Sequence, residues 1–373
     1  MRHRLQPIRF SVVPWLTLTR TWASRSAATH GASHGAPQVP LCERPPNEKA
    51  AQEDVRAFYE EARRAIRHDL KDGLGADGGP TMAELELELE YVMEDAVVGW
   101  KGSGEDDGAL FAMRMALGDV RDLWHERVSR RLPLQYLTSS AFWRDMVLSV
   151  GPGVLIPRPE TELMVDFVLE AVEANPSLGR GVWADLGTGS GALAVGVARA
   201  LPGAGTVYAA DIADEPLAYV AYNAARYDVG DRVRPIRSDW FDGLARELRE
   251  NAASTKLAGV VSNPPYIPSP TCATLQAEVK DHEPVLALDG GGALAVDCLV
   301  PICRGAAEML VEGGFLALET NGGEQAHWIV EFLEEHGFTN VRIRRDLRRV
   351  DRFVTATKRR AMNDELMRES PDK

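Results

Sequence analysis

An alternation of strands and helices that begins at residue 182 is the feature of this sequence that most constrains its fold. The apolar run 182–184 precedes a glycine-rich turn, 185–191, and the turn leads into a helical stretch, Ala192–Ala200. A second apolar run, 206–210, follows the helix and ends in Asp211. Parallel strands joined by helices produce such a pattern, so it predicts an α/β domain with a parallel sheet.

The glycine-rich turn predicts a nucleoside cofactor. Glycines let a ligand approach the backbone closely and allow the tight turn that this approach requires. Asp211 stands about 20 residues beyond the glycines, where an acid can accept hydrogen bonds from both ribose hydroxyls. The predicted cofactor-binding residues of the turn are Asp185, Gly187, Thr188, Gly189, Ser190 and Gly191.

The spacing of the turn leaves two cofactors open. Gly187, Gly189 and Ala192 loosely satisfy the dinucleotide fingerprint G-x-G-x-x-G/A, so spacing does not exclude an NAD-dependent dehydrogenase. Asp185 would repel a pyrophosphate, whereas it would attract a ligand that carries an ammonium and a sulfonium. S-adenosylmethionine is such a ligand, and the sequence favours it as the cofactor.

Asn263, Pro264, Pro265 and Tyr266 are the predicted catalytic residues, and Asn263 is also a predicted cofactor contact. They follow a short, β-branched run, 259–262, that is typical of a buried parallel strand. Chemistry in open α/β sheets sits at this end of a strand. The prolines stiffen the loop and remove two backbone donors, which leaves acceptors that can hold an NH2 group by both hydrogens. The alternative is a plain Asn-Pro turn.

Two further segments supply candidate cofactor contacts. A third apolar run, 233–236, leads to Asp239 and Trp240, which we expect at the adenine amino group and ring, although core packing is the commoner role of a tryptophan. Segment 156–162 is stiffened by two prolines around Arg158. It is expected to line a pocket, with Arg158 reaching a carboxylate, and a simple linker is the alternative.

Composition and charge argue against several classes of function. A net charge of −13 disfavours nonspecific nucleic-acid binding, which requires clustered Lys and Arg. The arginine-rich stretch 342–352 is expected to be a solvated hairpin face. No run reaches the ~18 apolar residues of a membrane span. The four cysteines show neither C-x-x-C spacing nor a histidine pattern, so we expect no disulfide framework and no metal site.

The start of the chain has the composition of an organelle transit peptide. Its first 42 residues contain no Asp or Glu and are rich in Arg, Ser and Thr. A mitochondrion and a plastid are equally compatible with this pattern. The alternative is a disordered tail that carries no targeting signal. We therefore exclude residues 1–45 from the predicted fold.

The remaining segments predict a helical region before the sheet and a hairpin after it. Helical periodicity marks residues 47–131, with helices expected around 55–66, over 82–93 and over 109–130. Residues 133–156 predict a β-hairpin linker. Beyond the catalytic loop we expect a long loop at 267–292, a helix at 293–311, a closing antiparallel hairpin from 341–343 and 353–357, and a polar tail at 359–373.

Taken together, these residues resemble the HemK/PrmC group of class I methyltransferases. The likeness is carried by the motifs above and by three further stretches, namely Ile156 to Thr161, Glu283-Pro284 and Arg352-Phe353-Val354. It covers about 133–358, while 47–131 matches only in kind. It implies a class I S-adenosylmethionine-dependent methyltransferase fold in 157–358, with a Rossmann-like sheet and a closing antiparallel hairpin, plus a small N-terminal helical bundle that docks the substrate.

Enzymes of that group methylate the side-chain amide nitrogen (N5) of the glutamine in the Gly-Gly-Gln motif of class I peptide chain release factors. The resemblance implies the same reaction here, with Asn263 and the Pro264 carbonyl holding the amide hydrogens and Tyr266 packing beside them. The tetrapeptide also occurs in adenine methyltransferases of DNA and RNA, and a noncatalytic nucleoside-binding module is a third alternative. The Arg158 segment and the acidic charge favour a release factor over nucleic acid as the partner. We also expect a monomeric enzyme that does not bind a membrane.

Overall fold

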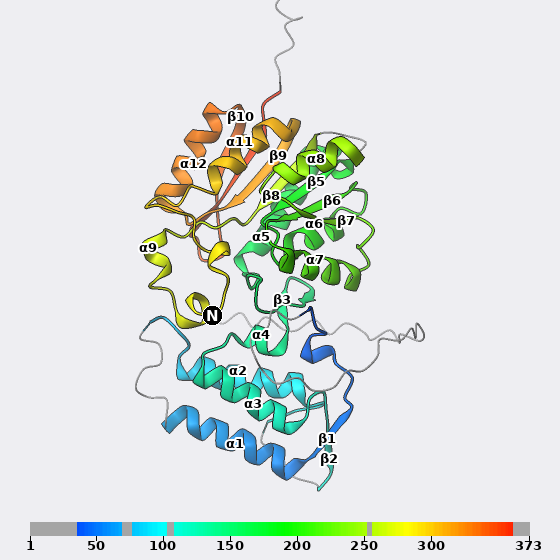
Figure 1. Cartoon of the computed structure of the whole chain (residues 1–373), viewed down its shortest axis with the longest axis vertical. Coiled ribbons are helices and arrows are strands. Elements are labelled where there is room, and N and C mark those ends of the chain that lie inside the picture. The colour runs from blue at the N-terminus through cyan, green and yellow to red at the C-terminus, as the bar shows by residue number, and fades with distance from the viewer. Residues whose placement is uncertain (1–35, 69–76, 103–107, 252–255, 361–373) are drawn as a thin grey trace, which may run out of the picture. The chain divides into compact units, whose positions relative to one another are not determined.

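The computed structural model describes residues 36–68, 77–102, 108–251 and 256–360 (Figure 1). Most of the expected transit peptide and most of the expected polar tail lie outside the described residues, and so does part of the glycine-rich break that follows the first predicted helix.

A seven-stranded sheet is the core of the larger folded region (Figure 1). Its strands are β5 (Trp183–Leu186), β6 (Val207–Asp211), β7 (Val233–Arg237), β8 (Leu257–Ser262), β9 (Leu310–Glu319), β10 (Phe338–Arg345) and β11 (Asp351–Lys358). They lie in the order β10-β11-β9-β8-β5-β6-β7. The strands β5 to β9 are parallel, whereas β11 runs antiparallel to both of its neighbours. The predicted parallel sheet with its closing antiparallel hairpin is confirmed.

Helices cover both faces of this sheet because successive strand side chains point to opposite faces. Trp183 and Val207 pack with α5 (Leu163–Ala174), α6 (Ala192–Ala200) and α7 (Asp214–Arg226). Ala184 and Tyr208 pack with α8 (Asp242–Asn251), α11 (Leu299–Met309) and α12 (Gly323–Glu335) on the other face. The strand order reverses between β5 and β8, which creates the crevice where open α/β sheets bind their ligands.

The helical region contains α1 (Gln52–His68), α2 (Met82–Ala96) and α3 (Leu117–Ser129) around its own apolar core. Strict Leu-Glu alternation opens α2, yet helix forms there because Leu85, Leu89 and Met93 share one buried face. Thr81 starts this helix with a reciprocal capping box to Glu84. The helices predicted in the first two segments are confirmed.

The third predicted helix, 109–130, is wrong at its start. Leu110–Met113 forms strand β2, which pairs antiparallel with β1 (Glu48–Ala51), and α3 begins only at Leu117. The linker opens with the short helix α4 (Leu134–Thr138), which was not predicted. Its hairpin, β3 (Ala141–Trp143) and β4 (Met146–Leu148), is confirmed.

Two more boundaries differ from the predictions. The helix expected at 293–311 begins at Leu299, and Leu310 already belongs to β9; the preceding loop contains the short helices α9 (Ser269–Cys272) and α10 (Ala277–Lys280). The boundary at residue 45 is too late, because Leu41 is fully buried in the core of the helical region. Gln38 also exchanges two hydrogen bonds with Ser149.

A cluster of charges joins the helical region to the segment that follows β8. Arg127 of α3 donates to Glu88 of α2 (2.6 Å) and to Glu278 of α10 (3.0 Å). Arg131 pairs with Glu278 and with Asp77. The Arg127 and Glu278 side chains are only 3% and 8% exposed, so the centre of this network is buried, while Glu88, Arg131 and Asp77 are partly exposed. None of the described helices is long and apolar enough to cross a membrane.

Candidate active site

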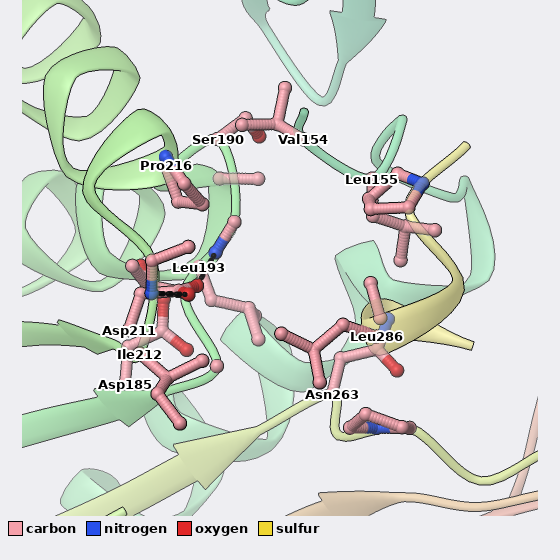
Figure 2. A pocket seen from close by; sticks show the side chains of 18 of the residues that line it. Val154, Leu155, Asp185, Ser190, Leu193, Asp211, Ile212, Pro216, Asn263 and Leu286 are labelled. Carbon is pink, nitrogen blue, oxygen red and sulfur yellow. Dashed lines mark hydrogen bonds between the residues drawn. The ribbon is translucent and has the colours of Figure 1, made fainter. Parts of the chain in front are cut away.

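A cavity of about 280 Å³ lies at the carboxyl ends of the parallel strands. Figure 2 shows Asp185 and Asp211 on one side of it and Asn263 with Leu286 on the other. These residues come from or follow β5, β6 and β8, so the strand order itself assembles the site. Of the predicted site residues, those that line the cavity are Arg158, Asp185, Gly187, Thr188, Gly189, Ser190, Asp211, Asp239, Trp240, Asn263 and Pro265. Gly191, Pro264 and Tyr266 are not among the described residues that line it.

Asp185 offers the cavity a buried acceptor. Its Oδ2 accepts hydrogen bonds from Thr188 Oγ1 (2.6 Å) and from the backbone N–H of Ala194 (3.1 Å). Its Oδ1 is buried and has no hydrogen-bond partner among the residues that the structure describes. Burial raises the pKa of this carboxyl to about 7, and the nearby charge of Asp211 adds to the rise. An unsatisfied buried acceptor is costly, so the ammonium of S-adenosylmethionine fits this position.

The turn after β5 keeps its backbone open toward the cavity. Gly187, Gly189 and Gly191 all have positive φ, a conformation that glycine adopts without strain. Gly191 is the N-cap residue of α6, and a Cβ there would lie 3.2 Å from Val220, so the turn packs tightly against α7. At Gly189 nothing lies within 4 Å of the position of a Cβ. A ligand can therefore approach the backbone at Gly189, as the sequence predicted.

Asp211 is held in place by backbone donors at the end of β6. Its Oδ2 accepts from the N–H of Gly189 and its Oδ1 from the N–H of Ala213, each at 3.1 Å. Burial raises its pKa, while these hydrogen bonds oppose the rise. Each oxygen retains a further lone pair that can accept another hydrogen bond, and the predicted contact with the two ribose hydroxyls stays a prediction.

The predicted adenine contacts differ in exposure. Trp240 is half-buried, lines the cavity beside Gly187, and has a positive φ of 42°. Ser238 fixes this loop by donating to the Trp240 carbonyl (2.7 Å) and accepting from the N–H of Gly243 (2.9 Å). Asp239 is exposed at the rim. Trp240 therefore forms part of the cavity lining. The adenine contacts of Asp239 and Trp240 stay predictions.

The side-chain oxygen of Asn263 and the carbonyl oxygen of Pro264 form a pair of acceptors on a fixed loop. Its side-chain Nδ2 donates to Thr161 Oγ1 (3.2 Å). Within the described residues, no donor reaches Asn263 Oδ1 or the carbonyl oxygen of Pro264. Gln325 holds the following loop by donating to the Tyr266 carbonyl (3.1 Å). The loop is therefore fixed, while two of its oxygens remain available.

Glu319 is a site residue that the sequence analysis missed. It ends β9, is fully buried, and accepts from Thr161 Oγ1 (2.6 Å) and from the Tyr266 hydroxyl (2.9 Å). Burial raises its pKa to about 7, against the two hydrogen bonds that lower it. The only available sequence signal was an acid directly after the apolar run 315–318.

Arg158 reaches a carboxylate, as predicted, but the carboxylate belongs to this chain. Its Nη2 donates to Glu283 Oε1 (2.6 Å), and Glu283 Oε2 accepts from the N–H of Ile156 (3.0 Å). The indole of Trp143 donates to the Arg158 carbonyl (3.0 Å). The proline-stiffened segment is thus fastened across the cavity, which excludes a simple linker, and a contact between Arg158 and the cofactor stays a prediction.

Comparison with solved structures gives only a weak overall likeness. A putative methyltransferase from Streptococcus mutans in complex with SAH has a TM-score of 0.36 and 19% identity, over 55% of this chain and 99% of that chain. No protein-family model matches the chain.

Curated relatives give a much clearer result. Release factor glutamine methyltransferases from Thermosynechococcus vestitus, Gloeobacter violaceus and a Synechocystis strain are 40%, 39% and 42% identical to this chain. The matches span 65%, 72% and 66% of this chain and 80%, 88% and 80% of the relatives. With the strand order and the acceptors around the cavity, they identify S-adenosylmethionine as the cofactor. The chain belongs to the family of release factor glutamine methyltransferases.

Proposed function

We propose that this enzyme transfers a methyl group from S-adenosylmethionine to the side-chain amide nitrogen of the glutamine in the Gly-Gly-Gln motif of an organellar class I release factor. The observation that carries the proposal is the acceptor pair formed by Asn263 Oδ1 and the Pro264 carbonyl, fixed and without a donor from the described residues. Two acceptors on a rigid loop match the two hydrogens of a primary amide. The names of the curated relatives support the glutamine substrate.

The chemical difficulty lies in the nucleophile. An amide nitrogen is a poor nucleophile because its lone pair is delocalised into the carbonyl. Asn263 and Pro264 would hold both N–H groups and so aim the nitrogen into the cavity. The same oxygens would stabilise the positive charge that develops on the nitrogen as its bond to the methyl carbon forms and the bond from that carbon to sulfur breaks, which leaves a neutral thioether. The surplus proton is then lost from the product to solvent, so no strong general base is required.

The cofactor supplies an electrophilic methyl group on a sulfonium. Asp185 Oδ1 would bind its ammonium, and Asp211 would accept the ribose hydroxyls. The proline-stiffened segment, fastened by the Arg158–Glu283 pair, would restrict water at the opposite side. The residues of the chain thus bind, orient and desolvate the two reactants.

The compartment and the docking region are part of the same proposal. The acid-free, arginine-rich start of the sequence supports import into an organelle. The three relatives are cyanobacterial, which favours the plastid over the mitochondrion, because plastids have cyanobacterial ancestry. The helical region would dock the release factor, since it borders the segment that closes the cavity.

The direct test measures methyl transfer from labelled S-adenosylmethionine by the purified full-length protein. Substrates are an organellar class I release factor, its variant with alanine in place of the motif glutamine, and duplex and structured nucleic acids. Label on the wild-type factor alone would establish the glutamine reaction. Label on nucleic acid would instead assign Asn263 and Tyr266 to an adenine, and would refute the proposal.

The substitution Asn263→Ala tests the acceptor pair. Loss of one preorganised contact to the reacting group is expected to lower turnover about 10²- to 10³-fold. Cofactor affinity, measured by calorimetry, should stay within about twofold, since Asn263 is not placed to hold the ammonium or the ribose. The comparison variant Asp211→Ala should show the opposite pattern, with cofactor affinity lowered more than turnover. Near-normal turnover by Asn263→Ala would refute the proposed mechanism.

A further inference from the structure

We infer that Glu319, acting through Thr161, is a positioning residue that decides which end of the Asn263 side-chain amide faces the substrate. This inference rests on the proposed function, because it concerns the acceptor that holds the glutamine. It assigns a role to two buried residues, Thr161, which lines the cavity, and Glu319, which is not among the lining residues. Its structural basis is a chain of hydrogen bonds from Glu319 to Thr161 and from Thr161 to Asn263.

The chain of hydrogen bonds is buried and tightly arranged. Glu319 is fully buried and Thr161 is 4% exposed. Thr161 Oγ1 lies 2.6 Å from Glu319 Oε2 and 3.2 Å from Asn263 Nδ2. The other carboxylate oxygen, Oε1, lies 2.9 Å from the Tyr266 hydroxyl. One carboxylate therefore contacts both ends of the catalytic loop, directly at Tyr266 and through Thr161 at Asn263.

The number of protons in this chain determines its direction. An ionised carboxylate only accepts hydrogen bonds, so Thr161 and Tyr266 must both donate to Glu319. A threonine hydroxyl has a single proton, which leaves Thr161 only lone pairs to offer Asn263. Asn263 must then turn its NH2 group toward Thr161. Its Oδ1 faces the opposite way, where it can accept from the substrate amide.

Without the carboxylate this selection disappears. A Thr161 hydroxyl that is free to rotate can donate to Asn263 Oδ1 as well as accept from Nδ2, so both orientations of the amide become available. In the reversed orientation Asn263 presents N–H groups to the N–H groups of the glutamine. That arrangement cannot hold the substrate amide, because two donors face each other.

Burial and the groups around Glu319 together set the pH at which it is ionised. Burial is the dominant cause and raises its pKa to about 7; the hydrogen bonds from Thr161 and Tyr266 lower the pKa, the charge of Glu160 raises it and that of Arg352 lowers it. Burial raises the pKa of the neighbouring Tyr266 hydroxyl, and the charges of Arg352 and Arg158 lower it. Protonation of Glu319 below about pH 7 is thus expected to release the orientation of Asn263.

The test uses Thr161→Val, which keeps the shape of the side chain but removes its hydroxyl, and Thr161→Ser, which keeps the hydroxyl. Turnover of Thr161→Val should fall about 10²-fold, the cost of a misplaced contact to the reacting group, with cofactor affinity unchanged. Thr161→Ser should recover most of the rate. If Thr161→Ser is as impaired as Thr161→Val, the hydroxyl is not the cause and the inference is wrong.

The pH profile gives a readout that a purely structural role would not change. At saturating cofactor, wild-type turnover should decline below about pH 7 as Glu319 takes up a proton. Thr161→Val should lose this decline, since the link from Glu319 to Asn263 is cut. An unchanged acidic limb in Thr161→Val would overturn the inference.

Side-chain amide exchange measured by NMR separates this inference from the proposed function. The Asn263 NH2 should exchange slowly in the wild type and in Thr161→Ser, and rapidly in Thr161→Val. This measurement needs no substrate, so it holds even if the wild type fails to methylate any release factor. Rapid exchange in the wild type would show that Asn263 is not held by Thr161, and would refute the inference directly.

Discussion

The buried carboxyl of Asp185 predicts a cofactor affinity that depends on pH. One of its oxygens accepts two hydrogen bonds, while the other has no partner among the described residues. Burial raises its pKa from 3.8 to about 7. At pH 6 most folded molecules therefore carry a neutral Asp185, which attracts the cofactor ammonium much less than the ionised form does. Cofactor binding should favour, and stabilise, the ionised carboxylate.

The magnitude follows from the ionised fraction. With a pKa of about 7, roughly a tenth of the Asp185 carboxyls are ionised at pH 6 and about half at pH 7. If only the ionised form binds, the dissociation constant should be about fivefold weaker at pH 6 than at pH 7, a difference of about 1 kcal/mol. Below pH 6 the loss should approach about tenfold per pH unit.

The sign for stability is opposite to that for binding. The folded-state pKa of Asp185 lies above its unfolded value, so between about pH 4 and 7 the folded chain binds the proton more tightly than the unfolded chain. This carboxyl therefore disfavours the folded, cofactor-free protein increasingly as pH rises through that window. Binding of the cationic ligand is expected to offset part of this cost.

Isothermal titration calorimetry from pH 5.5 to 7.0 at constant ionic strength would measure the effect. S-adenosylhomocysteine is a suitable ligand because it keeps the ammonium and carries no transferable methyl group. The control is Asp185→Asn, which should bind more weakly and show a smaller dependence on pH; any dependence that remains would report Asp211, whose pKa is also raised. Two results would refute the reasoning. One is an equal dissociation constant for the wild type at pH 6 and pH 7, and the other is a dissociation constant of Asp185→Asn that depends on pH as strongly as that of the wild type.

Two further substitutions test the framework around the site. Gly191→Ala should lower the free energy of unfolding by about 1–2 kcal/mol, because φ is +84° and the new Cβ would contact Val220. Gly189→Ala should lower it by less, because its new Cβ has no atom within 4 Å. Thermal unfolding of both variants without cofactor measures the difference. Glu278→Ala should lower the free energy of unfolding by about 2 kcal/mol, as measured by urea denaturation, because it removes a buried partner of Arg127, which then keeps only Glu88, and a partner of Arg131. The exposed comparison Glu86→Ala should shift the urea midpoint little, and equal shifts would contradict the proposed burial effect.

The sheet and most of the cofactor site could be predicted because their signals are local. An apolar run, a glycine-rich turn and a helix lie next to one another in the sequence, and the acids at the strand ends follow from the same pattern. Asp185 and Asp211 are accordingly found where they were expected. The same holds for Asn263, whose acceptors depend on the two prolines that follow it.

The errors concern residues whose partners are distant in sequence. Leu110–Met113 has helical neighbours, but its backbone pairs with Glu48–Ala51, which lies on the other side of two helices. Glu319 was read only as the end of a strand because nothing near it shows that Thr161 and Tyr266 lie beside it. A hydrogen-bond chain assembled from three separate segments leaves no periodic pattern to detect.

The charge cluster around Glu278 constrains how this protein can be recombined with its relatives. The arginines of the cluster come from the helical region, and its central carboxylate comes from the segment that continues to Glu283, the partner of Arg158. A chimera that took its first 131 residues from one relative and the remainder from another would separate charges that compensate each other. Exchanges across this junction should preserve activity only when Arg127, Arg131 and Glu278 are inherited as a set.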